Sequence, residues 1–242
     1  MAPAIPPGFE HDSGGHCSCC QNSMKLPRQE DAHRAFTLTE LVLVMLTVAL
    51  LFLLMVPLAH QLKAKSRGIT CVGNLKSMGL AFRIFATGQS NLFPMQIAAQ
   101  TPNSQATPAG LQSRTIAEYF RSLSNELSTP LLLRCPADSR KPATNFAGLR
   151  TANISYFLGL DATGLIPASL LVGDRNLTTN GFAAGPGVIG LTTNMTVGWT
   201  KDLHHFRGNI VLGDGSVQQF TDQRFSGFLS TSGVATNRVL IP

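Results

Sequence analysis

An uncharged run from Leu41 to Ala59 follows a single glutamate, Glu40, in the first quarter of the chain. Nineteen residues at a rise of 1.5 Å per residue form a helix roughly 28 Å long, close to the thickness of the hydrocarbon core of a bilayer. An ionised side chain at mid-bilayer costs roughly 2.5 to 3.5 kcal/mol, so Glu40 needs a positively charged partner. We therefore expect one transmembrane helix that begins with an acidic residue.

The residues around Glu40 match the processing site of a known family. The segment from Arg34 to Glu40 (RAFTLTE), with Pro57 at the twenty-second position from Phe36, resembles the N-terminus of type IV prepilins and type II secretion pseudopilins. The resemblance implies cleavage between Ala35 and Phe36 by a prepilin peptidase, N-methylation of Phe36, and pairing of Glu40 with the new terminal amine of a neighbouring subunit. The family nearly always has glycine before the cut, whereas this chain has Ala35.

The chain is expected to have three parts: a leader at 1–35, the transmembrane half of a helix at 36–60, and a head domain at 61–242. The leader is rich in Pro and Gly and has no helical or strand period. Met24 is an alternative start that would leave a leader of twelve residues. A cleaved secretory signal is a second interpretation of the apolar run, but its core is usually only about 7 to 15 residues long, and no Ala-x-Ala site follows here.

The leader also contains a short cluster of potential metal ligands. They are His11, His16, Cys17, Cys19 and Cys20. Their spacing fits no usual structural-zinc pattern, and processing would remove the segment. We therefore do not assign a metal there.

Apolar residues continue at helical spacing beyond the membrane run, and Lys76 and Arg83 fall on the opposite side. The expected helix extends from about Leu38 to Ala86, with a kink near Pro57 and a stop at Gly88. The apolar positions are Cys71, Leu75, Met78, Phe82 and Phe85.

Shorter elements are expected after this helix. Residues 89–112 have the composition of a loop, and 115–127 that of a helix with Ile116, Tyr119, Phe120, Leu123 and Leu127 on its buried side. Residues 154–160 and 170–172 are predicted strands, and 209–220 a hairpin with a primed turn at Asp214-Gly215. The predicted fold is α+β and pilin-like: the C-terminal half of the long helix packs on a small antiparallel sheet.

A second motif lies near the C-terminus, where His204, nine further residues and then Asp214-Gly215 follow one another. This spacing resembles the motif of a branch of prepilin-like proteins, which is also similar to this chain at 71–76, at Cys135-Pro136 and at 173–176. The role of the motif is open. His204 and Asp214 are turn or strand residues, an acid/base pair, or metal ligands together with His205.

Cys71 and Cys135 are candidates for a disulfide in an oxidising compartment, where closing a loop of some 65 residues would add roughly 3 to 4 kcal/mol. Two separate buried thiols are the alternative. Asp174-Arg175-Asn176 is interpreted as a salt-bridged turn rather than a small-molecule pocket, and Trp199 as a core residue. No cofactor is predicted, and calcium or zinc in the head domain is the alternative.

Composition limits the function further. Only 13% of residues are charged, and the net charge of +6 forms no patch with interleaved aromatics, so no nucleic-acid partner is expected. The sequence has no nucleophile elbow, His-Glu-x-x-His or phosphate loop, so it is not predicted to be an enzyme.

The resemblance therefore predicts a filament subunit, a pseudopilin or minor pilin, in a type II secretion or type IV pilus-like system. It implies a single-pass inner-membrane protein with its head outside the cytoplasm. Its implied partners are the prepilin peptidase, other pilin-like subunits, the inner-membrane assembly platform and the lipid bilayer. Secretion pseudopilus, surface pilus and DNA-uptake fibre remain open. The alternatives are a membrane-anchored metal-dependent hydrolase using His204, His205, Asp214 and Asp174, and a binding module for polysaccharide or protein cargo.

Overall fold

The structure, a computed structural model, describes residues 37–100 and 114–242, without the side chains of 56–64. Its longest element is the helix α1 (Leu38–Thr87), which confirms the predicted helix almost to the residue. The helix continues through Pro57. The leader, its Cys and His residues and the predicted cleavage site at Ala35 and Phe36 lie outside the described residues.

The chain divides into two compact units at Leu50 and Leu51, and each is described by itself. The first contains the start of α1. From Leu38 to Met55 the helix has a mean hydropathy of 2.6, and none of it is buried. Among the described residues, this is the one helix that is long and apolar enough to cross a membrane.

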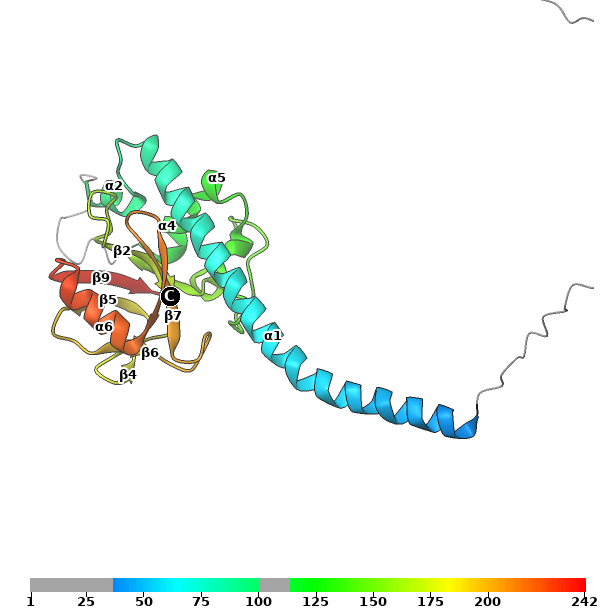
Figure 1. Cartoon of the computed structure of the whole chain (residues 1–242). Helices are drawn as coiled ribbons and strands as arrows, with labels where there is room; N and C mark the ends of the chain where they lie inside the picture. The colour runs from blue at the N-terminus through cyan, green and yellow to red at the C-terminus, as the bar shows by residue number, and fades with distance from the viewer. Residues whose placement is uncertain (1–36, 101–113) are drawn as a thin grey trace, which may run out of the picture. The chain divides into compact units, whose positions relative to one another are not determined.

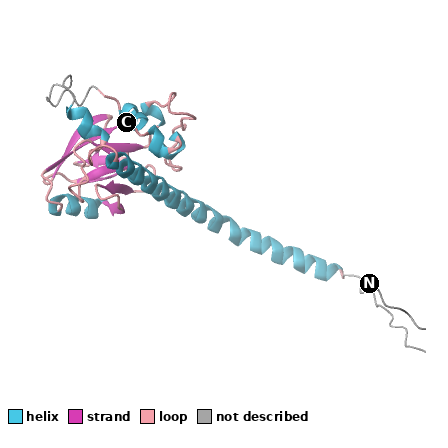
Figure 2. Ribbon diagram, turned by 90° about the horizontal axis from the view of Figure 1, so that it is seen from above, coloured by secondary structure: helices cyan, strands magenta, loops and turns pink. Residues whose placement is uncertain are grey.

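The second unit, here called the head, contains two antiparallel sheets with helices around them (Figures 1 and 2). Its helices besides α1 are α2 (Pro94–Gln100), α4 (Ile116–Ser122), α5 (Ser124–Leu127), α6 (Asp222–Thr231) and the 3-10 turns η1 (Pro130–Leu133) and η2 (Thr151–Asn153). Its strands are β1 (Tyr156–Gly159), β2 (Leu170–Asp174), β3 (Leu177–Thr179), β4 (Phe182–Ala183), β5 (Gly187–Thr192), β6 (Val197–Trp199), β7 (Arg207–Leu212), β8 (Val217–Thr221) and β9 (Thr236–Ile241).

The larger sheet has the strand order β5-β9-β1-β2-β7-β8, and the smaller has the order β4-β3-β6. All of the strand pairs are antiparallel. In the register of β1 and β2, Tyr156 lies opposite Asp174. The α+β class with an antiparallel sheet is therefore confirmed, although the sheets are larger than the small one predicted.

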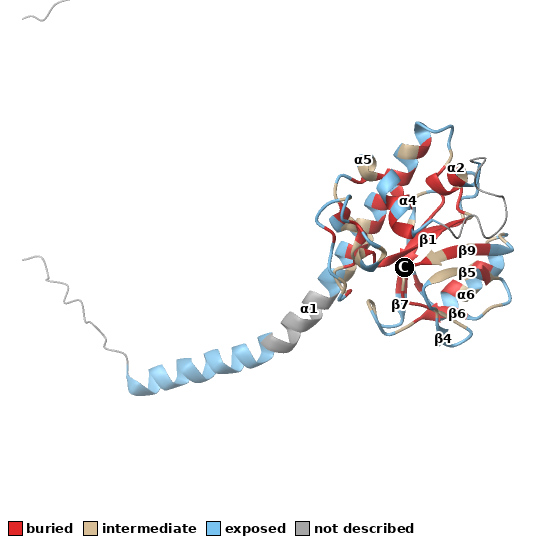
Figure 3. Ribbon diagram, turned by 180° about the vertical axis from the view of Figure 1, so that it is seen from behind, coloured by how far each residue is buried: buried red, intermediate tan, exposed pale blue. Residues whose placement is uncertain are grey.

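Side chains alternate across the large sheet and form two apolar layers. Figure 3 shows buried residues on the strands of this sheet and on the part of α1 beside it. On one face, Tyr156 and Leu158 pack with the predicted stripe of α1, of which Cys71, Leu75, Met78 and Phe82 are fully buried and Phe85 is half-buried. On the other face, Phe157 packs with α6 and with Trp199 of β6. Trp199 stacks on Phe225 with ring centroids 5.3 Å apart, which confirms its predicted core role. Burial of each large apolar side chain contributes about 1.5 to 3 kcal/mol.

The predicted strands at 154–160 and 170–172 and the hairpin at 209–220 are confirmed as β1, β2 and the pair β7 and β8. The predicted loop at 89–112 is wrong in part, because α2 occupies 94–100, and its remainder at 101–112 lies outside the described residues. The predicted helix at 115–127 is divided at Leu123 into α4 and α5, although its five predicted apolar positions are all buried.

The primed turn predicted at Asp214-Gly215 is wrong. The loop has three residues, with the Gly215 N–H donating to the Leu212 carbonyl and the Leu212 N–H donating to the Ser216 carbonyl. Within this loop only Gly215 has a positive φ, of 84°, as in a type I turn followed by a bulge, whereas a type I′ turn also needs a positive φ at Asp214.

Candidate functional site

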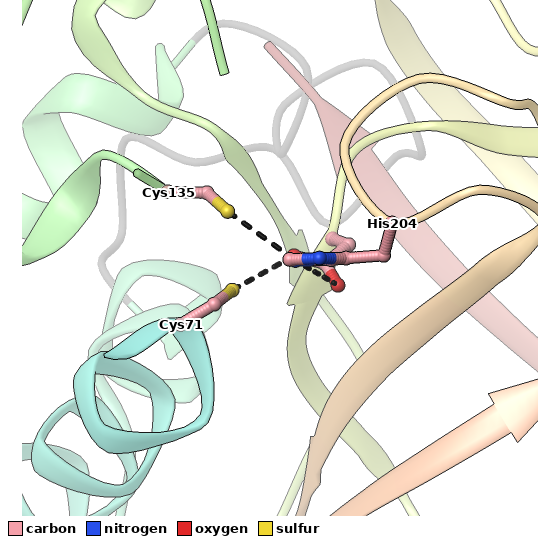
Figure 4. A group of neighbouring side chains, drawn as sticks. Cys71, Cys135 and His204 are labelled. Carbon is pink, nitrogen blue, oxygen red and sulfur yellow. Dashed lines mark hydrogen bonds and ion pairs between the residues drawn. The ribbon is translucent and has the colours of Figure 1, made fainter. Parts of the chain in front are cut away.

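Four side chains that can bind a metal converge inside the head, from four segments far apart in the sequence. Cys71 lies on α1, Cys135 follows η1, Asp174 ends β2, and His204 lies in the loop between β6 and β7. Figure 4 shows Cys71, Cys135 and His204 pointing toward one another. We refer to these four residues as the Cys-Cys-Asp-His cluster.

The four ligand atoms lie within 4.8 Å of one another. The Cys71 sulfur lies 3.4 Å from Asp174 Oδ1. The Cys135 sulfur lies 3.3 Å from His204 Nε2, and the same nitrogen lies 3.6 Å from Asp174 Oδ2. The side chains are also buried, because Cys71, Cys135 and Asp174 are 0% exposed and the His204 side chain is 9% exposed.

The Asp174 carboxylate is oriented by Asn209 of the neighbouring strand β7. Its Oδ2 accepts hydrogen bonds from the backbone N–H and the side-chain amide of Asn209, at 2.7 and 3.0 Å. The Asn209 Oδ1 in turn accepts from Gln219 Nε2 at 3.3 Å. Antiparallel pairing of β2, β7 and β8 thus fixes the direction in which Asp174 Oδ1 faces Cys71.

Cys135 is positioned by a tight turn and an ion pair. The Asp138 N–H donates to the Cys135 carbonyl at 2.9 Å. The Asp138 carboxylate is held by Arg175, the residue after Asp174, with Nε 2.8 Å from Oδ2 and Nη2 3.1 Å from Oδ1. The segments carrying Cys135 and Asp174 are therefore tied together beside the cluster.

His204 is presented by a loop with an unusual backbone. Its neighbours Leu203, His205 and Phe206 have φ values of 61°, 50° and 59°, in the left-handed region that costs residues other than Gly of order 1 to 3 kcal/mol each. Asn176 holds the loop through its side-chain amide, which donates to the carbonyls of Thr200 and Asp202 at 3.1 and 2.7 Å. A strained conformation fixed by surrounding contacts is typical of a functional loop.

Proximity perturbs the pKa values of the whole cluster. A hydrogen bond from Cys71 lowers the pKa of Cys135 to about 5 and raises the pKa of Cys71, so Cys135 is the thiol that ionises first. Burial raises the pKa of Asp174 to about 6, although His204 acts in the opposite direction. Burial alone lowers the pKa of His204, but the hydrogen bond to Cys135 and the charge of Asp174 outweigh it and raise that pKa.

The geometry does not suit a nucleophilic relay of Cys135, His204 and Asp174. In such a relay, one ring nitrogen of the histidine takes the proton of the nucleophile while the other donates to the carboxylate. Here His204 Nε2 faces both partners. The buried sulfurs also leave little access for a substrate. The arrangement suits ligation of an ion by all four residues.

The cluster changes the interpretation of several predicted site residues. Cys71 and Cys135 both belong to the cluster, where each is a free thiol whose sulfur contacts Asp174 or His204. The disulfide between them stays a prediction. Asp214 and Gly215 are not part of the cluster. Asp214 Oδ1 accepts from the Ser216 N–H at 2.8 Å, so these two residues form the hairpin turn, which is the structural one of their possible roles.

Sequence reasoning missed that Asp174 and His204 lie beside the two cysteines. Cys71, Cys135, Asp174 and His204 each belong to one of the sequence landmarks, but the landmarks carry no sign that they meet. Arg175 pairs with Asp138 rather than within a turn of its own, and Asn176 holds the His204 loop. The residue types at these landmarks suit a metal, but nothing in the sequence shows that they lie together.

A hollow of about 790 Å³ is lined in part by His204. Basic side chains line it at Lys65, Arg67, Lys201 and Arg207, together with His205. Among the described residues that line it, none is acidic. The hollow therefore suits an anionic ligand.

Glu40, in the first unit, forms a capping box with Thr37. The Thr37 N–H and hydroxyl donate to Glu40 Oε2 at 2.9 and 2.8 Å, and the Glu40 N–H donates to Thr37 Oγ1 at 3.3 Å. Sequence reasoning missed this cap, although Thr-x-x-Glu before an apolar run is its signature. Glu40 therefore has a local structural role besides any role between subunits.

Comparison with models of known protein families, with characterised proteins and with solved structures found no significant match.

Proposed function

We propose that the chain is a structural subunit of a type II secretion or type IV pilus-like filament, cleaved before Phe36 and assembled through Glu40. The observation that supports it best is the composition of α1. One continuous helix begins with Glu40 and an apolar, unburied stretch from Leu38 to Met55, and ends as a core element of an α+β head. Such a helix needs an apolar environment for its first part and a folded domain for its last.

Lipid and neighbouring helices supply that apolar environment. In the membrane, the unburied face from Leu38 to Met55 packs against lipid before assembly and against the helices of other subunits after it. The Glu40 carboxylate of one subunit attracts the N-terminal amine of Phe36 on another. The low dielectric strengthens this pair, so it sets the stagger between subunits.

Two variants of the capping box can separate the role of the Glu40 charge from the role of the helix cap. Glu40→Gln keeps a side chain that can reach back to the Thr37 N–H but removes the charge. Thr37→Ala removes the hydroxyl of the cap but keeps the charge. Both variants are expressed in cells with a prepilin peptidase and an assembly system, and the sheared filament fraction is compared with the membrane fraction.

We expect Glu40→Gln to insert and to be cleaved but to be lost from the filament fraction, and Thr37→Ala to assemble. Mass spectrometry of the mature chain should find N-methylated Phe36 as its first residue. Normal assembly of Glu40→Gln contradicts the pairing mechanism. A chain that keeps Ala35 attached to Phe36, in cells that process their other prepilins, overturns the proposed function.

The basic hollow supports a second candidate, a binding module for an acidic polysaccharide. Lys65, Arg67, Lys201 and Arg207 place four cations around one concave surface. Binding of heparin, used as a polyanionic probe, should weaken in Arg67→Ala/Lys201→Ala and with rising salt, and dextran should not bind. Equal retention of heparin and dextran, or no loss in the double variant, eliminates this candidate.

A further inference from the structure

We infer that Cys71, Cys135, Asp174 and His204 form a structural zinc site in the head. This inference is independent of the filament function, since it depends only on the packing of the head. The four side chains supply two sulfurs, one nitrogen and one oxygen, a donor set that Zn²⁺ binds readily.

The spacing of the donor atoms fits tetrahedral zinc. With Zn–S distances of about 2.3 Å and Zn–N and Zn–O distances of about 2.0 to 2.1 Å, the ligands of a tetrahedral ion are roughly 3.3 to 3.8 Å apart. The Cys71 sulfur lies 3.4 Å from Asp174 Oδ1 and the Cys135 sulfur 3.3 Å from His204 Nε2, and all four ligand atoms lie within 4.8 Å of one another. The side chains thus surround a space close to the size that the ion needs.

Burial supports the same conclusion. Two thiols, a carboxyl group and an imidazole share a region enclosed by core residues such as Tyr156, whose hydroxyl lies 3.3 Å from the Cys71 sulfur. Ionisable groups removed from water are normally paired with opposite charge or bound to a metal. A divalent cation would compensate the negative charges of the two thiolates and the carboxylate together.

The surrounding contacts resemble those that orient metal ligands. Asn209 donates two hydrogen bonds to Asp174 Oδ2, which leaves Oδ1 facing Cys71. Asn176 holds the loop that carries His204. Hydrogen-bonding partners outside the ligand shell typically change metal affinity by about 10- to 100-fold.

Other occupants fit less well. Calcium takes about six to eight oxygen ligands, whereas this cluster offers one carboxylate. A disulfide between Cys71 and Cys135 would leave Asp174 and His204 as a buried ion pair without the sulfurs as partners. Four protein ligands close the coordination shell, which is typical of structural rather than catalytic zinc.

The position of the site suggests what the ion would do. It would join α1, the segment after η1, the end of β2 and the β6–β7 loop, and thereby fasten the helix to the large sheet. Because such a site does not exist in the unfolded chain, binding energy becomes folding energy. The head should therefore be markedly less resistant to unfolding without the ion.

The test uses the full chain in detergent, carrying Cys17→Ser, Cys19→Ser and Cys20→Ser so that the leader thiols cannot bind metal, and an affinity tag without histidine. Metal content is measured by mass spectrometry after folding with zinc, and the coordination of the bound ion by X-ray absorption. Cys71→Ser, Cys135→Ser and His204→Ala remove ligands. His205→Ala is the matched control, since this neighbouring residue lies outside the cluster.

We expect about one zinc per chain, coordinated by two sulfurs at about 2.3 Å and two lighter atoms. The ligand variants should lose the ion, and His205→Ala should keep it. The X-ray absorption measurement uses the chain with an intact cluster and needs no ligand variant. Poor folding of a variant therefore does not affect its result. A folded chain without stoichiometric zinc overturns the inference. Two other results would also overturn it. One is zinc that stays bound in Cys71→Ser, and the other is a Cys71–Cys135 disulfide in zinc-free protein recovered from the cell envelope.

Discussion

Asn209 donates two hydrogen bonds to one oxygen of Asp174, from its backbone N–H at 2.7 Å and its side-chain amide at 3.0 Å. Both residues are buried, and they lie on the neighbouring strands β7 and β2. The pair connects the sheet to the Cys-Cys-Asp-His cluster, because the oxygen held by Asn209 leaves the other oxygen facing Cys71.

Asn209→Ala should weaken zinc binding by about 10- to 100-fold, because Asp174 loses its side-chain partner and its fixed direction. The dissociation constant is measured by competition with a chelator of known affinity. Gln219→Ala is the control, since Gln219 contacts Asn209 but not the cluster and should change affinity far less. Equal affinity of Asn209→Ala and the natural chain would show that Asn209 does not position Asp174.

Gly208 lies against the face of Trp199, and a Cβ at this position would come within 2.2 Å of the indole ring. Gly208→Ala should therefore lower the free energy of unfolding by about 1 to 3 kcal/mol, because neither β7 nor the stacked indole can move without disturbing the core. Denaturant unfolding followed by the fluorescence of the single tryptophan measures it.

The matched control for Gly208 is Gly227 on α6, where an added Cβ meets nothing within 4 Å. Gly227→Ala should raise the free energy of unfolding by up to about 1 kcal/mol, because alanine favours the helix more than glycine does. If both variants change stability equally, the contact with Trp199 is not the cause.

The buried ion pair of Asp138 should make the stability of the head depend on pH. Burial alone raises its pKa, but the hydrogen bonds from Arg175 and from the Arg140 N–H outweigh burial, so the net pKa lies below the ordinary value. A carboxyl group whose folded pKa is lowered stabilises the fold above its unfolded pKa of about 3.9, and that contribution disappears as pH falls through the folded pKa.

Asp138→Asn should therefore lower the free energy of unfolding at pH 7 by about 1.5 to 3 kcal/mol. The difference from the natural chain should shrink as pH falls below about 4. Asp161→Asn is the control. The Asp161 and Arg238 side chains are 29% and 37% exposed, so this variant should lower the free energy of unfolding by less than Asp138→Asn does. A difference for Asp138→Asn that stays constant down to about pH 2 would contradict the assigned ion pair.

The parts of the fold that were predicted have either a helical period or a short, continuous apolar run. The stripe from Cys71 to Phe82 repeats with the helical period over a buried surface, and β1 and β2 are short runs in which every residue is buried. The strands β3, β4 and β6 have only two or three residues, too few to define a period. In β9 the burial does alternate, and sequence reasoning missed that strand.

The sequence analysis named the residues of the cluster, but it did not predict them as one site. Cys71 and Cys135 were expected to meet, but no pattern in the sequence places Asp174 and His204 with them. Asp174 enters the cluster through the register of β2 with β7, and His204 through a loop with three left-handed residues. Both are consequences of long-range packing, which local patterns do not encode.

The proximity of Cys71 and Cys135 leads to a last prediction on thiol chemistry. Zinc should protect both thiols, because the ion occupies their sulfur lone pairs. Once a chelator removes it, Cys135, whose pKa is lowered to about 5, should ionise and react first. In the chain without leader thiols, maleimide labelling followed by peptide mass spectrometry should be slower with zinc than without it, because both thiols are buried and the head opens more readily without the ion. Cys135 should be labelled first. A mild oxidant should then join Cys135 to Cys71 in the zinc-free chain only, since a disulfide needs the sulfurs about 2.05 Å apart and the bound ion keeps them apart. Equal labelling with and without zinc would mean that the ion does not bind these sulfurs.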